Sequence, residues 1–85
     1  MTNGESTAPT DAEVARTAAR AAEAHVFDRL DRSAVEDIDI TTSFADGILE
    51  VDVYLHAPTG SVDTETVADE AARAGRTAVD ELLEN

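Results

Sequence analysis

The sequence predicts an α+β domain in which an antiparallel β-hairpin packs against two helices, in the order α-β-β-α. Three observations lead to this fold. Apolar residues recur at helical spacing over residues 11–31 and 67–83, they alternate over residues 38–55, and an Asp-Gly pair interrupts the alternation. A chain of 85 residues has room for one small domain with a thin core. We therefore expect a disordered tail over residues 1–10 and a single α+β domain over residues 11–85.

The first helix is predicted to begin after Thr10. Thr10 and Glu13 have the spacing of a capping box, in which each side chain binds the backbone N–H of the other residue. We expect the helix to extend from Asp11 to about Asp31. Its apolar stripe is thin because most of it is alanine, and it comprises Val14, Ala15, Ala18, Ala19, Ala22, Val26 and Leu30. The polar residues that fall mostly on the other side are Arg16, Arg20, Glu23 and Asp28.

The hairpin is predicted from two alternating runs separated by Asp46-Gly47. An Asp-Gly pair favours a type I′ turn, in which both central residues have positive φ. A two-residue turn here fixes a register that places every apolar residue on one face, with the pairs Phe44–Leu49, Thr42–Val51, Ile40–Val53 and Ile38–Leu55. A slip of one residue would expose the whole set, so the sequence specifies this register strongly.

The second helix is predicted to follow the break at residues 57–60 and to end near Leu83. Ser61, Asp63 and Thr64 are the candidate N-caps. Its apolar face comprises Val67, Ala68, Ala71, Ala72, Gly75, Ala78, Val79, Leu82 and Leu83. A glycine inside a helix costs roughly 1 kcal/mol relative to alanine. Gly75 therefore indicates either a close approach of another helix or a tolerated surface glycine.

The predicted sheet looks incomplete on its own. A two-stranded sheet is marginally stable in water, and both of its strands are edge strands. We expect the sheet to be extended by a dimer or by another protein.

The charge of the chain is strongly unbalanced, with 19 Asp and Glu, 6 Arg and no Lys, for a net charge of −13. This composition resembles that of proteins adapted to near-saturating salt, as in haloarchaeal cytoplasm. It argues against direct binding of nucleic acid or anionic membrane, because both need cationic side chains. The chain has no cysteine, no apolar run long enough to span a membrane and no signal-peptide pattern, so we expect a cytoplasmic protein.

Acidic residues gather on the outer face of the predicted hairpin: Asp37, Asp39, Glu50 and Asp52, with His56 opposite Asp37 and Tyr54 opposite Asp39. They suggest either a cation site or acid–base pair, or a solvated acidic surface typical of this composition. No metal-binding, nucleophile or phosphate-binding motif is present, so we expect no catalytic, cofactor or metal residues. Tyr54 is either a contact anchor for a partner or a cover for the acidic surface.

The order of elements, and in particular the stretch Phe44–Leu55 followed by an alanine-rich helix, resembles the archaeal Pcc-type small subunits of the KEOPS complex. The likeness is greatest to an archaeal paralogue group catalogued as a domain of unknown function. That family has a strand before the first helix, whereas Met1–Pro9 has no strand pattern here. The departure fits a shortened paralogue that caps or extends the sheet of a partner.

The resemblance implies a non-catalytic accessory role in the complex that installs threonylcarbamoyl on adenosine in tRNA. The partner would be a small KEOPS-type subunit, the catalytic subunit or a second copy. The residues implied in protein interaction are Ile38, Ile40, Phe44, Val51, Tyr54 and Leu55 on the sheet, and Ala71, Gly75, Ala78 and Leu82 on the second helix. The alternatives are a homo-oligomeric halophilic scaffold and a metal-dependent enzyme that uses the acidic face.

The net charge generates a prediction about salt. Self-repulsion among the carboxylates is unscreened in dilute buffer, so we expect the fold to be lost below a few tenths molar KCl. Far-UV circular dichroism across a KCl series measures this loss directly. Full cooperative folding in water would contradict this account of the charge.

Overall fold

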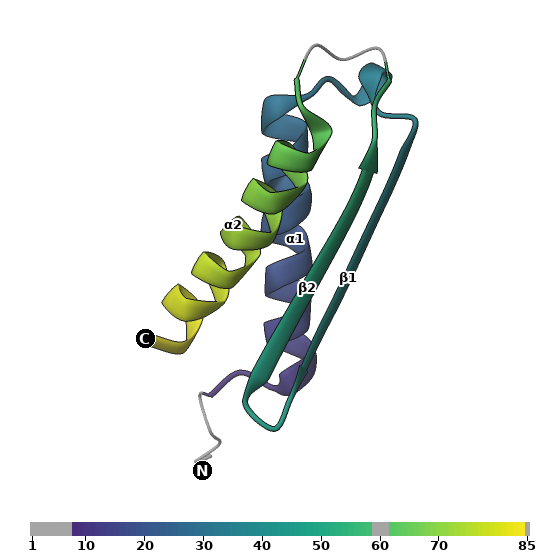
Figure 1. Cartoon of the computed structure of the whole chain (residues 1–85). Helices are drawn as coiled ribbons and strands as arrows, with labels where there is room; N and C mark the ends of the chain where they lie inside the picture. The colour runs from purple at the N-terminus through teal and green to yellow at the C-terminus, as the bar shows by residue number, and fades with distance from the viewer. Residues whose placement is uncertain (1–7, 59–61, 85) are drawn as a thin grey trace.

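The computed structural model describes residues 8–58 and 62–84 and confirms the predicted α-β-β-α order (Figure 1). The elements in chain order are α1 (Asp11–Arg29), a short 3₁₀ turn η1 (Arg32–Ala34), β1 (Asp37–Ala45), β2 (Ile48–His56) and α2 (Thr64–Glu84). The tail predicted over residues 1–10 lies outside the described residues except for its last three. The candidate cap Ser61 also lies outside them.

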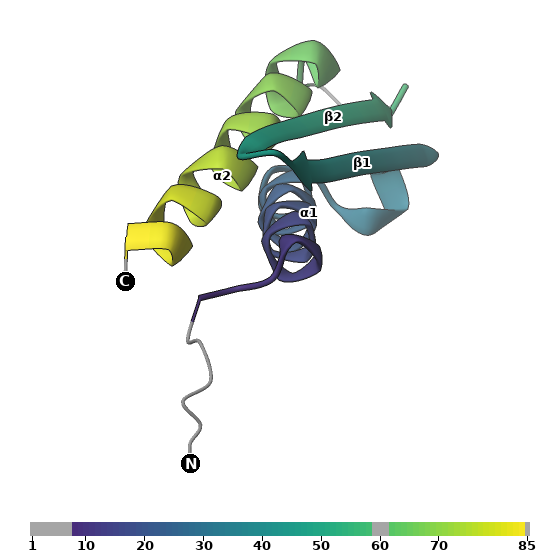
Figure 2. The same ribbon diagram turned by 90° about the horizontal axis from the view of Figure 1, so that it is seen from below.

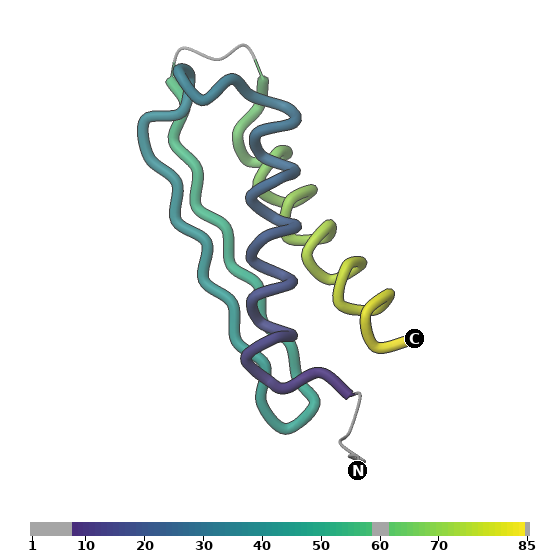
Figure 3. Tube along the Cα trace, turned by 180° about the vertical axis from the view of Figure 1, so that it is seen from behind, coloured from purple at the N-terminus to yellow at the C-terminus, as the bar shows by residue number. Residues whose placement is uncertain are grey.

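The elements form two layers, with the hairpin as one layer and both helices covering the same face of it (Figures 1 and 2). The two helices pack most extensively against each other; of the two strands, α1 contacts mainly β1 and α2 contacts mainly β2. The two helices lie side by side near η1 and diverge toward the hairpin turn, so the end of α2 extends away from the sheet (Figure 3).

The hairpin has the register that the alternation predicts. Ile38 pairs with Leu55, Ile40 with Val53, Thr42 with Val51 and Phe44 with Leu49. The turn is also as predicted, because Asp46 has φ 55° and Gly47 has φ 77°. The residues of the opposite row are all exposed, and these include every carboxylate of the two strands.

The helix caps follow the sequence closely. The Thr10 N–H donates to Glu13 Oε1 at 2.9 Å and the Glu13 N–H donates to Thr10 Oγ1 at 3.1 Å, which confirms the capping box. Helix α1 ends at Arg29, two residues before the predicted end, because Leu30 adopts an extended conformation that buries its side chain. At the start of α2, Asp63 accepts hydrogen bonds from the Glu65 N–H at 3.0 Å and the Thr66 hydroxyl at 3.2 Å.

The core lies between the helices and the inner face of the hairpin in two adjoining clusters. The cluster nearer η1 comprises Ala22, Val26, Leu30, Leu55, Ala57, Val67 and Ala71, and the cluster nearer the hairpin turn comprises Val14, Ala18, Val51 and Val79. Most members are small, so the core is as thin as the alanine-rich stripe predicts. The Thr42 hydroxyl faces this core and donates to the Ala15 carbonyl at 2.8 Å, which ties β1 to α1.

Gly75 marks the close approach of the two helices. A Cβ atom at this position would lie 2.9 Å from the backbone oxygen of Ala18, a distance that Cβ atoms essentially never show. Gly75 is buried, and Ala18 and Ala71 beside it are fully buried. The structure therefore confirms the close approach and excludes the alternative of a surface glycine.

The last turn of α2 departs from the predicted apolar face. Leu83 is 49% exposed, because α2 has diverged from α1 and the hairpin by this point. No helix in the described ranges is both long enough and apolar enough to cross a membrane.

The close approach at Gly75 generates a stability prediction. We expect Gly75→Ala to destabilise the protein by about 1–3 kcal/mol, because the added methyl overpacks the helix contact. This loss opposes the roughly 1 kcal/mol that alanine gains in an ordinary helix interior. Urea denaturation in high KCl measures the difference.

The matched control is Thr77→Ala, at an exposed position of the same helix. There the gain in helix propensity acts alone, and we expect stabilisation of up to about 0.7 kcal/mol. A Gly75→Ala variant as stable as Thr77→Ala would contradict the close contact.

Candidate protein-interaction surface

The hairpin has two faces and two open edges. The sheet contains only β1 and β2 among the described residues, so each strand has one edge without a neighbouring strand. Among the described residues, the strands make one main-chain hydrogen bond outside the hairpin ladder, from the Glu36 N–H to the His56 carbonyl. Both edges therefore retain main-chain donors and acceptors for another strand.

The predicted interaction residues on the inner row of the hairpin are covered to different extents. Val51 and Leu55 on β2 are buried, at 6% and 8% exposure. Ile38, Ile40 and Phe44 on β1 are only half-buried. The helix layer therefore covers β2 more completely than β1, and the incomplete coverage lies along the β1 edge.

The predicted helix-docking residues divide into two pairs. Ala71 and Gly75 contact α1 of the same chain, so in this structure they have no surface left for a partner. The reason is that the second helix against which this small-residue face packs is α1 itself. Ala78 and Leu82, one and two turns further along α2, are half-buried. They are the accessible part of the predicted docking face.

The outer face of the hairpin is an exposed acidic surface. Asp37 lies opposite His56 and Asp39 lies opposite Tyr54, as the register predicts. Tyr54 is 55% exposed. The nearest charged contact of His56 is long, with 3.8 Å between its Nε2 and Glu36 Oε1. Within the described residues, no group of three or more His, Asp or Glu side chains is placed to hold a metal ion.

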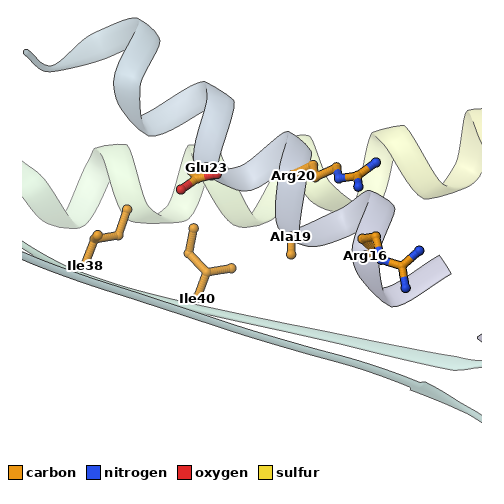
Figure 4. Close-up of a pocket in the computed structure, with 6 residues that line it drawn as sticks. All are labelled: Arg16, Ala19, Arg20, Glu23, Ile38 and Ile40. Carbon is orange, nitrogen blue, oxygen red and sulfur yellow. The ribbon is translucent and has the colours of Figure 1, made fainter. Parts of the chain in front are cut away.

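A groove that the sequence does not predict lies between α1 and the open edge of β1 (Figure 4). We call it the β1-edge groove; it has a volume of about 280 Å³ and is lined by Arg16, Ala19, Arg20, Glu23, Ile38 and Ile40. The sequence places Arg16 and Arg20 on the polar side of the helix. Their spacing of four residues is a weak signal that both share one face, but it does not show which element they face.

A second groove lies at the opposite edge of the sheet, between β2 and the first turns of α2. It also has a volume of about 280 Å³, and its lining residues are Val53, Tyr54, Leu55, Thr64, Glu65 and Ala68. Its one charged lining residue is Glu65, whereas the β1-edge groove has two arginines and Glu23. The two edges therefore differ in charge.

A polar cluster joins the two helices. Glu70 of α2 accepts from the Arg29 guanidinium and contacts His25 Nε2 at 3.2 Å, and both of these partners belong to α1. The hydrogen bond from His25 and the charge of Arg29 hold the pKa of Glu70 below its usual value. His25 itself is half-buried.

Comparison with known proteins gives one family and two similar relatives. A family model described as protein of unknown function (DUF3194) matches residues 9–82. An uncharacterized protein of the archaeon Natronomonas pharaonis is 45% identical over 84 residues, which cover 99% of this chain and 100% of that protein. An uncharacterized protein of the archaeon Thermococcus kodakarensis is 43% identical over 75 residues, which cover 84% of this chain and 69% of that protein. No solved structure matches the chain.

The Glu70 cluster generates a prediction about acid stability. A carboxyl group whose pKa is lower in the folded state stabilises the fold above its unfolded pKa, and this stabilisation is lost as the pH falls through the folded value. We expect Glu70→Gln to lower the urea midpoint near neutral pH, and the deficit relative to the wild type to shrink as the pH falls below about 4.5.

The matched control is Asp69→Asn, at an exposed position of the same helix without an ion pair among the described residues. We expect a small effect that varies little over the same pH range. A Glu70→Gln deficit that stays constant down to about pH 3 would contradict the ionic character of the cluster.

Proposed function

We propose that this chain, which belongs to the DUF3194 family, is a non-catalytic subunit that acts by binding another protein. The observation that carries the proposal is the two-stranded sheet with both edges open. Strands with unpaired main-chain groups are commonly completed by a strand of another chain. The half-buried inner row of β1 supports the same conclusion, because a neighbouring strand would cover it further.

The partner we propose is a small Pcc-type subunit of the KEOPS complex or its catalytic subunit. The support is the resemblance of the helix, hairpin and alanine-rich helix to the Pcc-type subunits. In this role the chain would be an accessory to the modification of adenosine in tRNA. The net charge of −13 argues that the tRNA would be bound by other subunits.

A homo-oligomeric scaffold is the second candidate function, and the open edges favour it equally. An enzyme that uses the acidic face is a weaker third candidate. The carboxylates of that face are all exposed to solvent, whereas catalytic acids and bases usually lie in a cleft.

Co-expression tests the proposed partner. We expect the chain to co-purify with a Pcc-type small subunit or with the catalytic subunit in about 2 M KCl, where non-specific charge attraction is screened. Size-exclusion chromatography with light scattering gives the stoichiometry. A double variant, Asp39→Asn with Glu50→Gln, should bind as well as the wild type, because it changes only the acidic face.

Each other outcome is informative. A chain that elutes as its own oligomer and ignores both KEOPS subunits would support the scaffold function. Loss of a complex in the double variant would show that the acidic face takes part in binding.

A further inference from the structure

We propose that the β1-edge groove receives an extended strand of a partner protein, and that this strand carries two carboxylates on its inward-facing row. The inference rests on the proposed function and specifies the chemistry of the partner at one edge of the sheet. It depends on three features of the groove: the open strand edge, the apolar floor and two arginines without ion pairs.

The open edge of β1 provides the main-chain contacts. In an antiparallel ladder, every second residue directs its N–H and C=O groups away from the neighbouring strand. Along β1 these groups have no main-chain partner among the described residues. An added strand would therefore form a regular ladder there without any change to the hairpin.

The floor of the groove is apolar. Ile38 and Ile40 project from β1 toward α1, and Ala19 faces them from the helix (Figure 4). Both isoleucines are only half-buried. The inward side chains of an added strand would lie beside them, and apolar side chains at that point would complete their burial.

The arginines provide the charge. Arg16 and Arg20 are exposed and have no ion pair in the described part of the chain. Arg29 and Arg32, in contrast, have partners within the chain: Arg29 binds Glu70, and Arg32 stacks on the Phe27 ring at 4.2 Å. Glu23 lines the same groove, so its lining has a net charge of +1 in a chain whose net charge is −13. Two unpaired cations in this setting indicate an acidic ligand.

The spacing of the arginines matches an extended strand. Four residues of helix advance about 6 Å along the axis. Two residues of strand advance about 6.6 Å and return to the same face. Two successive inward carboxylates would therefore meet Arg20 and Arg16 in turn. Because Thr42 lies beside Ala15, the arginines follow the isoleucines along β1, and the inward row of the partner changes from apolar to acidic in that direction.

A second copy that joins this edge with its helices on the same face of the sheet does not offer such a strand. The inward row of β1 is Ile38, Ile40, Thr42 and Phe44, and that of β2 is Leu49, Val51, Val53 and Leu55. Neither row contains a carboxylate, because all acidic residues of the two strands lie on the outer face. A copy joined in this way would place no carboxylate beside the arginines, so the occupant we propose is a different protein.

Synthetic peptides test the inference. The probes are acetyl-Thr-Val-Thr-Val-Thr-Glu-Thr-Glu-Thr-amide and its reverse, acetyl-Thr-Glu-Thr-Glu-Thr-Val-Thr-Val-Thr-amide, since an added strand can run in either direction. Titration into ¹⁵N-labelled protein in about 1 M KCl, followed by NMR, reports both the site and the affinity. We expect one direction to bind, with shifts confined to β1 and the facing side of α1. Replacement of both Glu by Gln should weaken that peptide at least tenfold.

Protein variants identify the arginines. We expect Arg16→Gln with Arg20→Gln to weaken the Glu peptide at least tenfold and to leave the affinity for the Gln peptide unchanged. The matched control is Arg73→Gln with Arg76→Gln, an equal change in charge at exposed positions of α2. This control should bind the Glu peptide like the wild type. Circular dichroism confirms that both variants fold.

Four results would overturn the inference. The first is that neither peptide shifts the signals of β1, and the second is that the Gln peptide binds as well as the Glu peptide. The third is equal binding of acetyl-Thr-Val-Glu-Val-Glu-Val-Thr-amide, which has Val on one face and Glu on the other. The fourth is that a second copy already occupies the β1 edge in solution.

The proposed function is tested separately. Peptide binding without a KEOPS partner would keep the groove and remove that assignment. A KEOPS complex that still forms with the Arg16 and Arg20 double variant would keep the KEOPS assignment and remove the inference about the groove.

Discussion

The close contact between α1 and α2 at Ala18 and Gly75 is the constraint on which the rest of this structure depends. Because Gly75 has no side chain, the two helix backbones approach so closely that no space for a Cβ atom remains between Gly75 and Ala18. The helices can then be held by small residues, chiefly alanine, which suits a chain with few large apolar side chains. Larger residues at this crossing would separate the helices and enlarge a core that the chain has no bulk to fill.

The same contact determines how the hairpin is covered. Two helices held this close together cover little more than the width of two strands, and of the two strands each helix contacts mainly the one nearest to it. As α2 diverges toward the hairpin turn, coverage decreases and the sheet edges stay accessible. The open edges and both grooves are thus consequences of a narrow helix layer. A protein built this way can present a strand edge to a partner without unfolding any part of itself.

Charged residues occupy distinct places in this fold. The carboxylates of the strands face solvent, whereas Glu70, whose pKa is lowered, binds His25 and Arg29 across the helix contact. The arginines serve different purposes: Arg29 joins the helices, while Arg16 and Arg20 border the open β1 edge. The lining of the β1-edge groove thus has a net charge of +1 in a chain whose net charge is −13, a pattern that favours selective binding over strong non-specific attraction.

The sequence by itself determined the elements and the hairpin register. The capping box at Thr10, the Asp46-Gly47 turn and the alternation on both sides of it are local signals, and each depends on residues a few positions apart. For Gly75 the sequence left open a close approach of another helix or a surface glycine, and it did not show that the partner was α1 of the same chain. Only the tertiary structure decided which small residues the helix contact would bury, which strand would be less covered and which side of the sheet the arginines would border. These features depend on the distance and angle between helices, which are set by packing among residues far apart in the chain.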